Sequence, residues 1–317
     1  MKRIVCIIAI ICLLLPLLAA CGPDDTTIRI GVLNGPTAMG ALKMWEDGDT
    51  RYEFTLYTSP DQILPDIAAG KLDIAALPTN NAAAYYNQYE KNTRVIVLNT
   101  LGVLYLLDAT GTITSLSDLE GKTVYVPNAG SNPEYILRHI LDEKGINATI
   151  ETSLVQPTAI QSGLLGGTIQ IAVLPQPAAT ATVLNAKSNG KTLTAIDLSA
   201  EWNEIEDTPI AQGCLLASAA FCEENPRAIK EFLEAYQASV EYMTATENLD
   251  AAAELVVAKG ILPKAAVAKQ ALPKCAISYV DGEEMKATLK SFYEILYAYN
   301  PVSIGGAVPD DAFYYEK

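Results

Sequence analysis

The chain has 317 residues, half of them hydrophobic, and its 22 basic and 37 acidic residues give a net charge of −15. The length exceeds one ordinary domain and fits two units of about 100–200 residues. The acidic balance argues against nucleic-acid binding, which needs clustered Lys and Arg, and against electrostatic docking on anionic lipid.

The N-terminus has the pattern of an export signal. Lys2 and Arg3 precede the apolar run IVCIIAIICLLLPLLAA, and Cys21 follows Leu-Ala-Ala. This pattern predicts a secretory signal peptide over residues 1–20 and a tether over 21–26, because the run is too short and too near the start for a spanning helix. Leu-Ala-Ala-Cys is similar to the lipobox of bacterial lipoproteins, which implies lipidation of Cys21; the alternative is an ordinary signal with a chance cysteine. Removal of the signal takes away two basic residues and leaves a net charge of −17.

Strand-like and helix-like segments alternate through the first part of the chain. In chain order we expect a strand over 27–35, a helix over 37–48, a strand over 51–58, a helix over 60–69, a strand over 72–77 and a helix from residue 79. The long apolar stretch RVIVLNTLGVLYLLD follows and contains Asn99 and Thr100 in its middle. It therefore predicts two strands.

The second part repeats this alternation and then becomes helical. We expect a short helix over 115–121, a strand over 122–127, a helix over 134–145, a strand over 149–154, a helix over 157–166, a strand over 168–174, a helix over 178–187 and a strand over 210–221. Two sets of apolar residues at helical spacing then predict long amphipathic helices. They are Ile229, Phe232, Leu233, Tyr236, Val240 and Met243 in the first, and Met285, Leu289, Phe292, Tyr293 and Leu296 in the second.

Two segments of the same design lie 97 positions apart. GKLDIAALPTN begins at Gly70 and GTIQIAVLPQP begins at Gly167. In each, a helix ends at the glycine, a short apolar run suits a buried parallel strand, and Leu-Pro opens a new helix. The repeat predicts two similar α/β lobes.

Repeated βα units favour an α/β fold with mainly parallel sheets flanked by helices. We expect lobe one to hold residues 27–100 plus 211–317 and lobe two to hold 101–210. The chain would cross between them near Asn99-Thr100 and near 210–213. Such a two-segment hinge suits capture of a ligand by closure.

The candidate ligand-binding residues follow four expected strands. Ligands of open α/β sheets sit beyond the carboxyl ends of the strands, where neutral polar side chains and helix N-termini can hold them. These residues are Asn34, Gly35, Thr37, Thr79, Asn80, Asn81, Asn128, Gly130, Ser131, Asn132 and Gln176, with Tyr57 as a residue that could stack on a ring. Helix capping is the alternative role for each Asn or Ser, and packing is the alternative for the tyrosine. Because the loops contain no Arg or Lys, a neutral polar or heterocyclic ligand is favoured, while a small oxyanion held by helix dipoles stays open.

Signals for catalysis, metals and cofactors are weak. His139 is the one histidine and lies in a helical run, where a structural role is favoured. Gly121-Lys122-Thr123 lacks the earlier glycine that a phosphate-binding loop needs. The remaining cysteines of the mature part, Cys214, Cys222 and Cys275, have no metal spacing; they allow one disulfide, with 214 and 222 nearest in sequence, or three free thiols. We expect no catalytic residue, no metal and no cofactor.

Several motifs make the chain resemble the lipid-anchored substrate-binding proteins of bacterial ABC importers, in the group of nitrate, sulfonate, taurine and thiamine-precursor binders. They are GKLDIAALPTNNAA, DLEGKTVYVPNAGSNPEYILRHIL, IQIAVLPQPAATATVL and NPVSIGGAVPDDAFYY. The resemblance covers almost the whole mature chain and implies a two-lobed type II periplasmic-binding fold. It also implies ligand contacts from the loops at 34–37, 79–81 and 130–132 and from Gln176. Related chains often have Glu at this last position, so the glutamine removes a charge from the expected cleft.

The resemblance implies a non-catalytic receptor, exported and either lipid-anchored to the outer face of the cell membrane or periplasmic. It would be a monomer that binds a small-molecule ligand and works with ABC permease and ATPase subunits. One alternative is an enzyme of this fold, similar to those of thiamine-pyrimidine or menaquinone biosynthesis, although the cysteine-rich motif of the yeast-type pyrimidine synthase is missing. The other alternative is a surface sensor.

Overall fold

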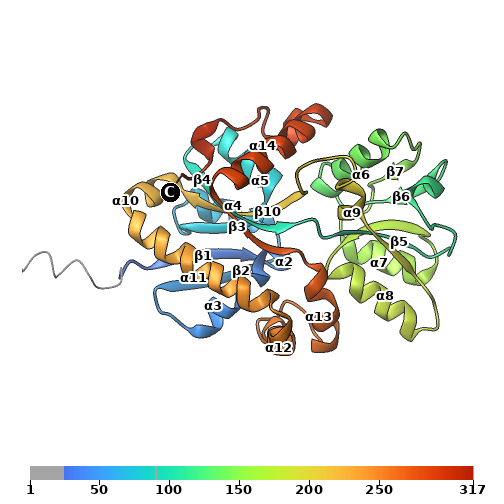
Figure 1. The fold of residues 1–317 in the computed structure, drawn as a ribbon, viewed down its shortest axis with the longest axis horizontal. Coiled ribbons are helices and arrows are strands. Elements are labelled where there is room, and N and C mark those ends of the chain that lie inside the picture. The colour runs from blue at the N-terminus through green and yellow to red at the C-terminus, as the bar shows by residue number, and fades with distance from the viewer. Residues whose placement is uncertain (1–24, 90, 317) are drawn as a thin grey trace, which may run out of the picture.

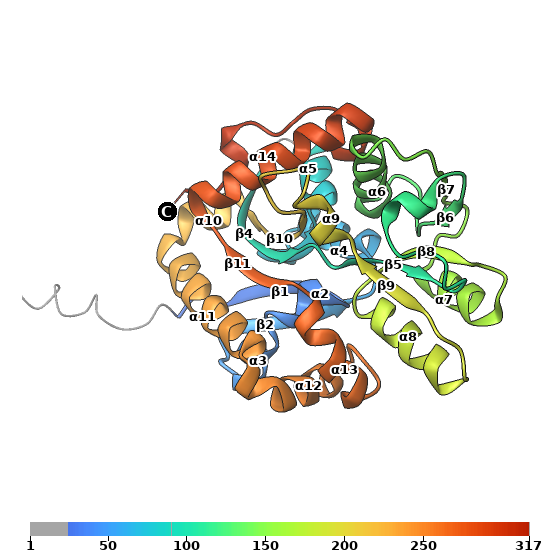
Figure 2. The same cartoon turned by 45° about the vertical axis from the view of Figure 1, so that its right-hand side comes forward.

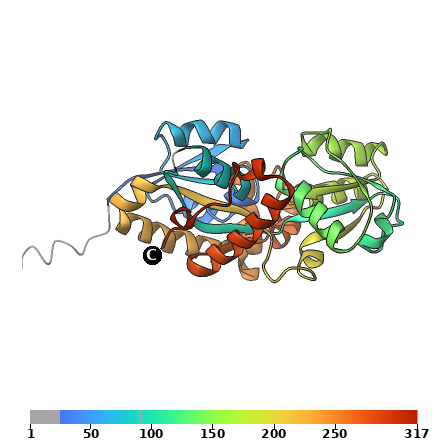
Figure 3. The same cartoon turned by 90° about the horizontal axis from the view of Figure 1, so that it is seen from above.

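The computed structural model describes residues 25–89 and 91–316, so the expected signal peptide, Cys21 and most of the expected tether lie outside the described residues. Two β-sheets flanked by helices lie side by side along the long axis of the molecule (Figures 1 and 3). We call the unit around the six-stranded sheet lobe 1 and the unit around the five-stranded sheet lobe 2. In the described part of the chain, no helix combines the length and the apolar character that a membrane crossing requires.

The sheet of lobe 1 has the strand order β11-β4-β10-β3-β1-β2. Its strands are β1 (Ile28–Leu33), β2 (Tyr52–Tyr57), β3 (Ile74–Pro78), β4 (Thr93–Leu101), β10 (Ala211–Ser218) and β11 (Ile277–Val280). The sheet of lobe 2 has the order β7-β6-β8-β5-β9. Its strands are β5 (Leu104–Asp108), β6 (Thr123–Tyr125), β7 (Thr149–Glu151), β8 (Ile171–Pro175) and β9 (Thr194–Asp197). Lobe 1 is thus built from two separate parts of the chain. The expected lobe limits at 100/101 and 210/211 stay a prediction.

The helices cover both faces of the sheets. The α-helices are α2 (Pro36–Met39), α3 (Leu42–Asp47), α4 (Pro60–Ala68), α5 (Thr79–Gln88), α6 (Asn132–Glu143), α7 (Pro157–Gly166), α8 (Ala178–Ser188), α9 (Leu198–Trp202), α10 (Ala219–Glu224), α11 (Pro226–Thr244), α12 (Leu249–Ala258), α13 (Ala265–Ala271) and α14 (Gly282–Tyr299). The 3₁₀ helices are η1 (Leu116–Leu119), η2 (Thr246–Asn248), η3 (Leu272–Lys274), η4 (Pro301–Ile304) and η5 (Asp311–Phe313). The α/β class, the two-lobed architecture and the flanking helices agree with the prediction.

The sheets are mixed, which corrects the expectation of mainly parallel sheets. The pairs β1–β2, β1–β3, β6–β7 and β6–β8 are parallel, whereas β10 and β5 run antiparallel to both of their neighbours. The cause is the double crossing between lobes. A chain that leaves lobe 1 along β4 enters lobe 2 on a strand pointing away from the boundary, and it must return along β10 against the direction of β3 and β4.

The sequence repeat is present in the structure as one arrangement in each lobe. Helix α4, strand β3 and helix α5 form the first copy, and α7, β8 and α8 form the second. Gly70 and Gly167 close the first helix of each copy with φ of 64° and 81°, as predicted from their position. In both copies the strand has a parallel neighbour in its sheet, β1 for β3 and β6 for β8.

Several expected elements have other limits in the structure, and for two of them the contacts give a reason. The helix expected over 37–48 is divided into α2 and α3, with Gly40 between them. A Cβ at this glycine would lie 2.6 Å from the Tyr236 hydroxyl of α11, so tight tertiary packing accompanies the break. The strand expected over 210–221 ends at Ser218, because the Ser218 side chain accepts a hydrogen bond from Phe221 N and caps α10.

The two long C-terminal helices pack on lobe 1 through the predicted apolar positions. Helix α11 buries Phe232 and Tyr236 in one cluster, together with β1 residues such as Ile30. Helix α14 buries Phe292 and Tyr293 in another cluster, which also contains residues of lobe 2. Seen from above, the C-terminal segment in red lies in front of the boundary between the lobes (Figure 3).

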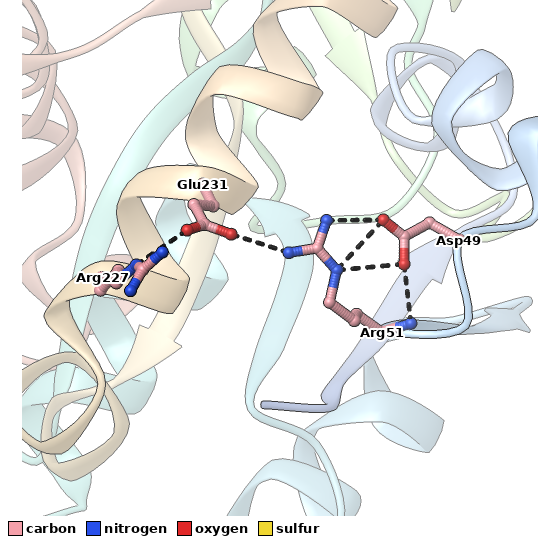
Figure 4. A network of polar contacts seen from close by, with 4 residues as sticks. All are labelled: Asp49, Arg51, Arg227 and Glu231. Atoms are coloured by element: carbon pink, nitrogen blue, oxygen red, sulfur yellow. Dashed lines mark hydrogen bonds and ion pairs between the residues drawn. The ribbon is translucent and has the colours of Figure 1, made fainter. Parts of the chain in front are cut away.

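A charged network ties the turn before β2 to α11 on lobe 1 (Figure 4). The Arg51 guanidinium donates to Asp49 Oδ2 at 2.7 Å and to Glu231 Oε2 at 2.7 Å. Arg227 donates from Nε to Glu231 Oε1 at 3.0 Å and extends the chain of charges. Hydrogen bonds from Arg51 hold the pKa of Asp49 below its usual value. Exposed ion pairs contribute only about 0–1 kcal/mol each, so this network orients α11 more than it stabilises the fold.

Candidate functional site

The loops at the carboxyl ends of four strands lead into helix N-termini. Strands β1 and β3 of lobe 1 lead into α2 and α5, while β6 and β8 of lobe 2 lead into α6 and α8. Figure 2 shows α13 beside α8 and α14 near α6, so lobe 1 approaches lobe 2 on two sides of these loops. Carboxyl ends of strands are the usual place for a ligand in open α/β sheets.

A hydrogen bond joins the two lobes at the centre of these loops. The side-chain amide of Asn132, at the start of α6, donates to Thr79 Oγ1 at 3.1 Å. Thr79 begins α5 and is completely buried. Two of the predicted loops, one from each lobe, are thereby in direct contact.

Thr79 is held by groups from three other elements. Its Oγ1 donates to the carbonyl of Ala211 in β10 at 2.6 Å while it accepts from Asn132. Its own carbonyl accepts from the Tyr293 hydroxyl of α14 at 2.9 Å. These three hydrogen bonds fix the position of Thr79 at the contact between the lobes.

Asn132 and Asn80 retain unused polar groups. Asn132 is 2% exposed, and its Oδ1 has no hydrogen-bond partner among the described residues. A buried acceptor without a partner costs about 1–3 kcal/mol, which a donor on a ligand would recover. Asn80 is 9% exposed, and within the described chain its side chain forms no hydrogen bond. Both side chains therefore keep polar atoms without a partner among the described residues.

The loop after β1 depends on a glycine-only backbone conformation. Gly35 caps α2 with φ 131° and ψ −158°, a region that side chains other than hydrogen rarely adopt. Thr37 Oγ1 donates to the Leu33 carbonyl at 3.2 Å, so this hydroxyl closes the local turn. Asn34 is exposed, and its backbone N–H continues the parallel pairing with Tyr57.

Asn99 is a buried polar residue that the list of candidate binding residues did not include. Its side-chain amide donates to the Thr37 carbonyl at 3.1 Å, and its Oδ1 accepts from the Thr100 hydroxyl at 3.1 Å. Gly213 of β10 lies against this pair, because a Cβ there would be 2.7 Å from Thr37 Cγ2 and 2.8 Å from Asn99 Oδ1. The signal in the sequence was the Asn-Thr pair inside an otherwise apolar run.

The loop after β6 uses most of its polar groups internally. The Gly130 N–H donates to Glu134 Oε2 at 2.7 Å, and the same carboxylate accepts from Arg138 at 2.8 Å and 3.0 Å. The Ser131 hydroxyl donates to the Pro127 carbonyl at 3.0 Å. Asn128 is exposed with φ 62°, a conformation that Asn tolerates. Of the four candidates in this loop, Asn132 alone reaches the partner lobe through a described hydrogen bond.

Gln176 follows β8 and is 2% exposed. Its backbone N–H donates to the Val103 carbonyl at 2.8 Å, next to the crossing between lobes. Its Oε1 accepts from Thr180 N at 3.3 Å within the first turn of α8. The glutamine thus caps its own helix with the carbonyl end of the side chain and keeps the N–H end of the amide for another partner.

Tyr57 and Asn81 lie at the edge of the arrangement. The Tyr57 hydroxyl donates to Asp66 Oδ2 of α4 at 2.7 Å. Desolvation and this bond raise the pKa of Tyr57 to about 12. These contacts match the packing role for the tyrosine. Asn81 is partly buried in the first turn of α5.

The described cysteines are buried thiols, and the histidine is paired with a carboxylate. Cys214, Cys222 and Cys275 are free and buried, so the alternative of a disulfide between 214 and 222 is wrong. Burial raises the pKa of Cys222 and of Cys275 to about 12, which keeps these thiols protonated at neutral pH. His139 Nε2 lies 2.6 Å from Glu206 Oε1, and its ring packs against Trp202. In residues 25–89 and 91–316, no group of three or more His, Cys, Asp or Glu side chains could hold a metal ion.

Comparison with known proteins relates this geometry to one family. The model of the family described as NMT1/THI5 like matches residues 53–248. The fold is similar to that of an ABC transporter protein from Parabacteroides distasonis, with TM-score 0.80, 23% identity, and coverage of 92% of this chain and 100% of that chain. It is also similar to the periplasmic aliphatic sulphonate binding protein SsuA from Escherichia coli, with TM-score 0.72, 14% identity, and coverage of 92% and 93%.

A third similar structure is the ligand binding component of an ABC-type import system from Staphylococcus aureus, with TM-score 0.67, 13% identity, and coverage of 92% and 96%. A search of curated proteins found no match. At these identities the structural likenesses establish the fold.

Proposed function

The chain belongs to the NMT1/THI5-like family, and from this membership we propose that it is an extracytoplasmic solute-binding lipoprotein of an ABC importer. It captures a small polar or heterocyclic solute between its lobes and delivers the solute to an import permease. The ligand-binding candidates carried into this proposal are the loops at 34–37 and 79–81, Asn132 and Gln176. Two bodies close on the solute: lobe 1, with residues 27–100 plus 211–317, and lobe 2, with residues 101–210.

The observation that carries the proposal is the hydrogen bond from Asn132 to Thr79. It joins helix N-termini that follow β3 in one sheet and β6 in the other. Groups split between two bodies form a complete contact set only when the bodies close. A ligand that uses both halves therefore binds the closed state better, and this difference in affinity drives closure.

The energy available from neutral groups is sufficient for capture. Each hydrogen bond contributes about 0.5–1.5 kcal/mol net, and each helix N-terminus adds roughly 0.3–1 kcal/mol for an anionic group. A micromolar ligand needs about 8 kcal/mol, so several such contacts together with partial desolvation of the solute reach that value. The Glu134–Arg138 ion pair adds no net charge beside Asn132.

The lipid anchor and the partners are proposed from the sequence. Cys21 would carry the lipid on the outer face of the cell membrane, and the tether over 21–26 would give the lobes reach toward the permease. The protein would act as a monomer, with permease and ATPase subunits supplying the energy of transport. Catalysis through the thiols has less support, because Cys222 and Cys275 stay protonated at neutral pH.

A thermal-unfolding screen of the full-length protein in detergent micelles tests the proposal. A bound solute at 100 times its Kd should add roughly 2.7 kcal/mol of stability, which corresponds to about 4 °C in Tm. The solute recovered from the complex should be chemically unchanged. Conversion of the solute to a product would contradict the receptor function and favour an enzyme. Binding of the solute without its uptake by cells that carry the importer would favour a sensor.

A further inference from the structure

The sequence contains two Asn-Gly pairs, Asn34-Gly35 and Asn189-Gly190. In such a pair the backbone nitrogen of the second residue can attack the asparagine side chain, because glycine has no side chain to shield that nitrogen. Both asparagines are exposed, and a Cβ at either glycine would meet no atom within 4 Å. The two pairs are therefore alike in exposure and crowding, and they differ in their hydrogen bonds.

The pair at the end of α8 is held by the last turn of that helix. The Asn189 side-chain amide donates to the Asn185 carbonyl at 2.9 Å. The Gly190 N–H donates to the Lys187 carbonyl at 3.1 Å. The attacking nitrogen and the amide that would leave are both engaged, so two hydrogen bonds must break before these groups can react.

The pair between β1 and α2 lacks both restraints. Among the described residues, neither the Asn34 side chain nor the Gly35 N–H has a hydrogen-bond partner. The loop also requires this glycine, since φ 131° and ψ −158° exclude residues with a Cβ. The backbone conformation that leads from β1 into α2 thus leaves a reactive Asn-Gly pair at the surface.

We propose that Asn34 is a site of spontaneous modification, at which the folded protein converts this asparagine to aspartate or isoaspartate. The Gly35 nitrogen attacks Asn34 Cγ, the bond from Cγ to Nδ2 breaks, and ammonia leaves with the proton of the glycine N–H. Water then opens the five-membered succinimide ring at either of its carbonyls and leaves a carboxyl group. Water is the co-reactant, and no group is oxidised or reduced.

The modification changes both the charge and the backbone of the expected binding loop. The new carboxyl group is ionised at neutral pH, since its reference pKa is about 3.9, and it replaces an amide that could donate to a ligand. In isoaspartate the chain runs through the side-chain carbon, so one more backbone atom separates β1 from α2. The effect on solute capture rests on the proposed function, whereas the modification itself does not.

Hydroxylamine tests the proposal, because it cleaves the chain at a succinimide. The full-length protein in detergent is incubated with hydroxylamine at mildly alkaline pH, once folded and once in denaturant, and mass spectrometry identifies the fragments. The folded protein should be cut after Asn34 at least about tenfold faster than after Asn189, the factor expected when two hydrogen bonds must open. In denaturant the two rates should approach each other. Equal rates in the folded protein, or a faster cut after Asn189, would overturn the proposal.

A tryptic peptide gives a second readout without hydroxylamine. The peptide of residues 30–43 contains Asn34 and no other Asn or Gln. During storage of the folded protein it should gain the mass difference between water and ammonia and separate into two isomers. Asn34→Gln should stop this gain, because the longer side chain would have to form a less favourable six-membered ring. An equally fast gain in Asn34→Gln would contradict the succinimide route.

Fresh and stored samples separate this site from the proposed function. If a solute is found, its affinity for the wild-type protein should fall during storage, and its affinity for Asn34→Gln should stay constant during storage. If Asn34 is modified but no solute is captured, the proposed function fails and the modification site stands. If a solute is captured but the folded protein is not cut after Asn34, the receptor function stands and the modification site is refuted.

Discussion

The crossing between the lobes contains a β-branched residue in a left-handed conformation, and this leads to a quantitative prediction. Val103 lies between β4 and β5 with φ 76°, directly after Gly102 with φ 67°. Its side chain is 3% exposed, and its carbonyl accepts from Gln176 N. A β-branched residue with positive φ is a genuine outlier, so we expect strain at this point of the crossing.

The strain can be measured by comparing an alanine variant with a glycine variant at two positions. The change in the free energy of unfolding from the alanine variant to the glycine variant is called a step. A left-handed conformation costs a residue with a Cβ roughly 1–2 kcal/mol, and glycine avoids this cost. Glycine also loses about 0.5–1 kcal/mol relative to alanine through the entropy of the unfolded chain. At Val103 the step from Val103→Ala to Val103→Gly should therefore stabilise the fold by about 0.5–1 kcal/mol. At Val97, a buried residue within β4, the step from Val97→Ala to Val97→Gly should destabilise it by about 0.5–1 kcal/mol.

Urea unfolding followed by tryptophan fluorescence gives the four free energies of unfolding. Comparing Ala with Gly at one position cancels the loss of the valine side chain, which would otherwise dominate. The two steps should differ by about 1–2 kcal/mol and have opposite signs. Equal steps of the same sign at both positions would refute the reasoning that Val103 stores backbone strain.

Two further predictions concern the site and the acid stability of lobe 2. Asn80→Ala and Asn132→Ala should each weaken solute binding about two- to tenfold, which is the contribution of one neutral hydrogen bond. Asn185→Ala, at an exposed position of α8, is the control. Full affinity of both site variants in calorimetry would contradict the assignment of these residues to the site. Asp108 is buried, which raises its pKa, but hydrogen bonds from Thr110, Thr112 and Ile113 outweigh burial and hold the pKa below the ordinary 3.8. Because the folded pKa is depressed, its contribution to stability is present above pH 3.8 and is lost as the pH falls through the folded value. Asp108→Asn should reduce the slope of urea stability against pH between about pH 2 and 4, and an unchanged slope would contradict this role.

The sequence by itself determined the elements and their faces. The repeat at Gly70 and Gly167 predicted two copies of a helix, strand and helix unit, because each signal is local: a positive φ, an apolar run and a proline that opens a helix. Helical spacing predicted the buried faces of α11 and α14, because one amphipathic helix records which side meets the core. The polar loops after the strands followed from the same local patterns.

Tertiary structure alone decided which of those loop groups remain available. Whether the Gly130 N–H faces a ligand depends on Glu134 turning back to it, and whether Asn132 reaches Thr79 depends on how the two sheets are set against each other. The antiparallel strands β5 and β10 follow from the double crossing between the lobes. The sequence of a single segment does not indicate this crossing. Gln176 and Lys274 line one cavity although almost 100 residues separate them along the chain. Contacts between distant segments depend on the packing of whole elements, and local residue patterns carry no information about that packing.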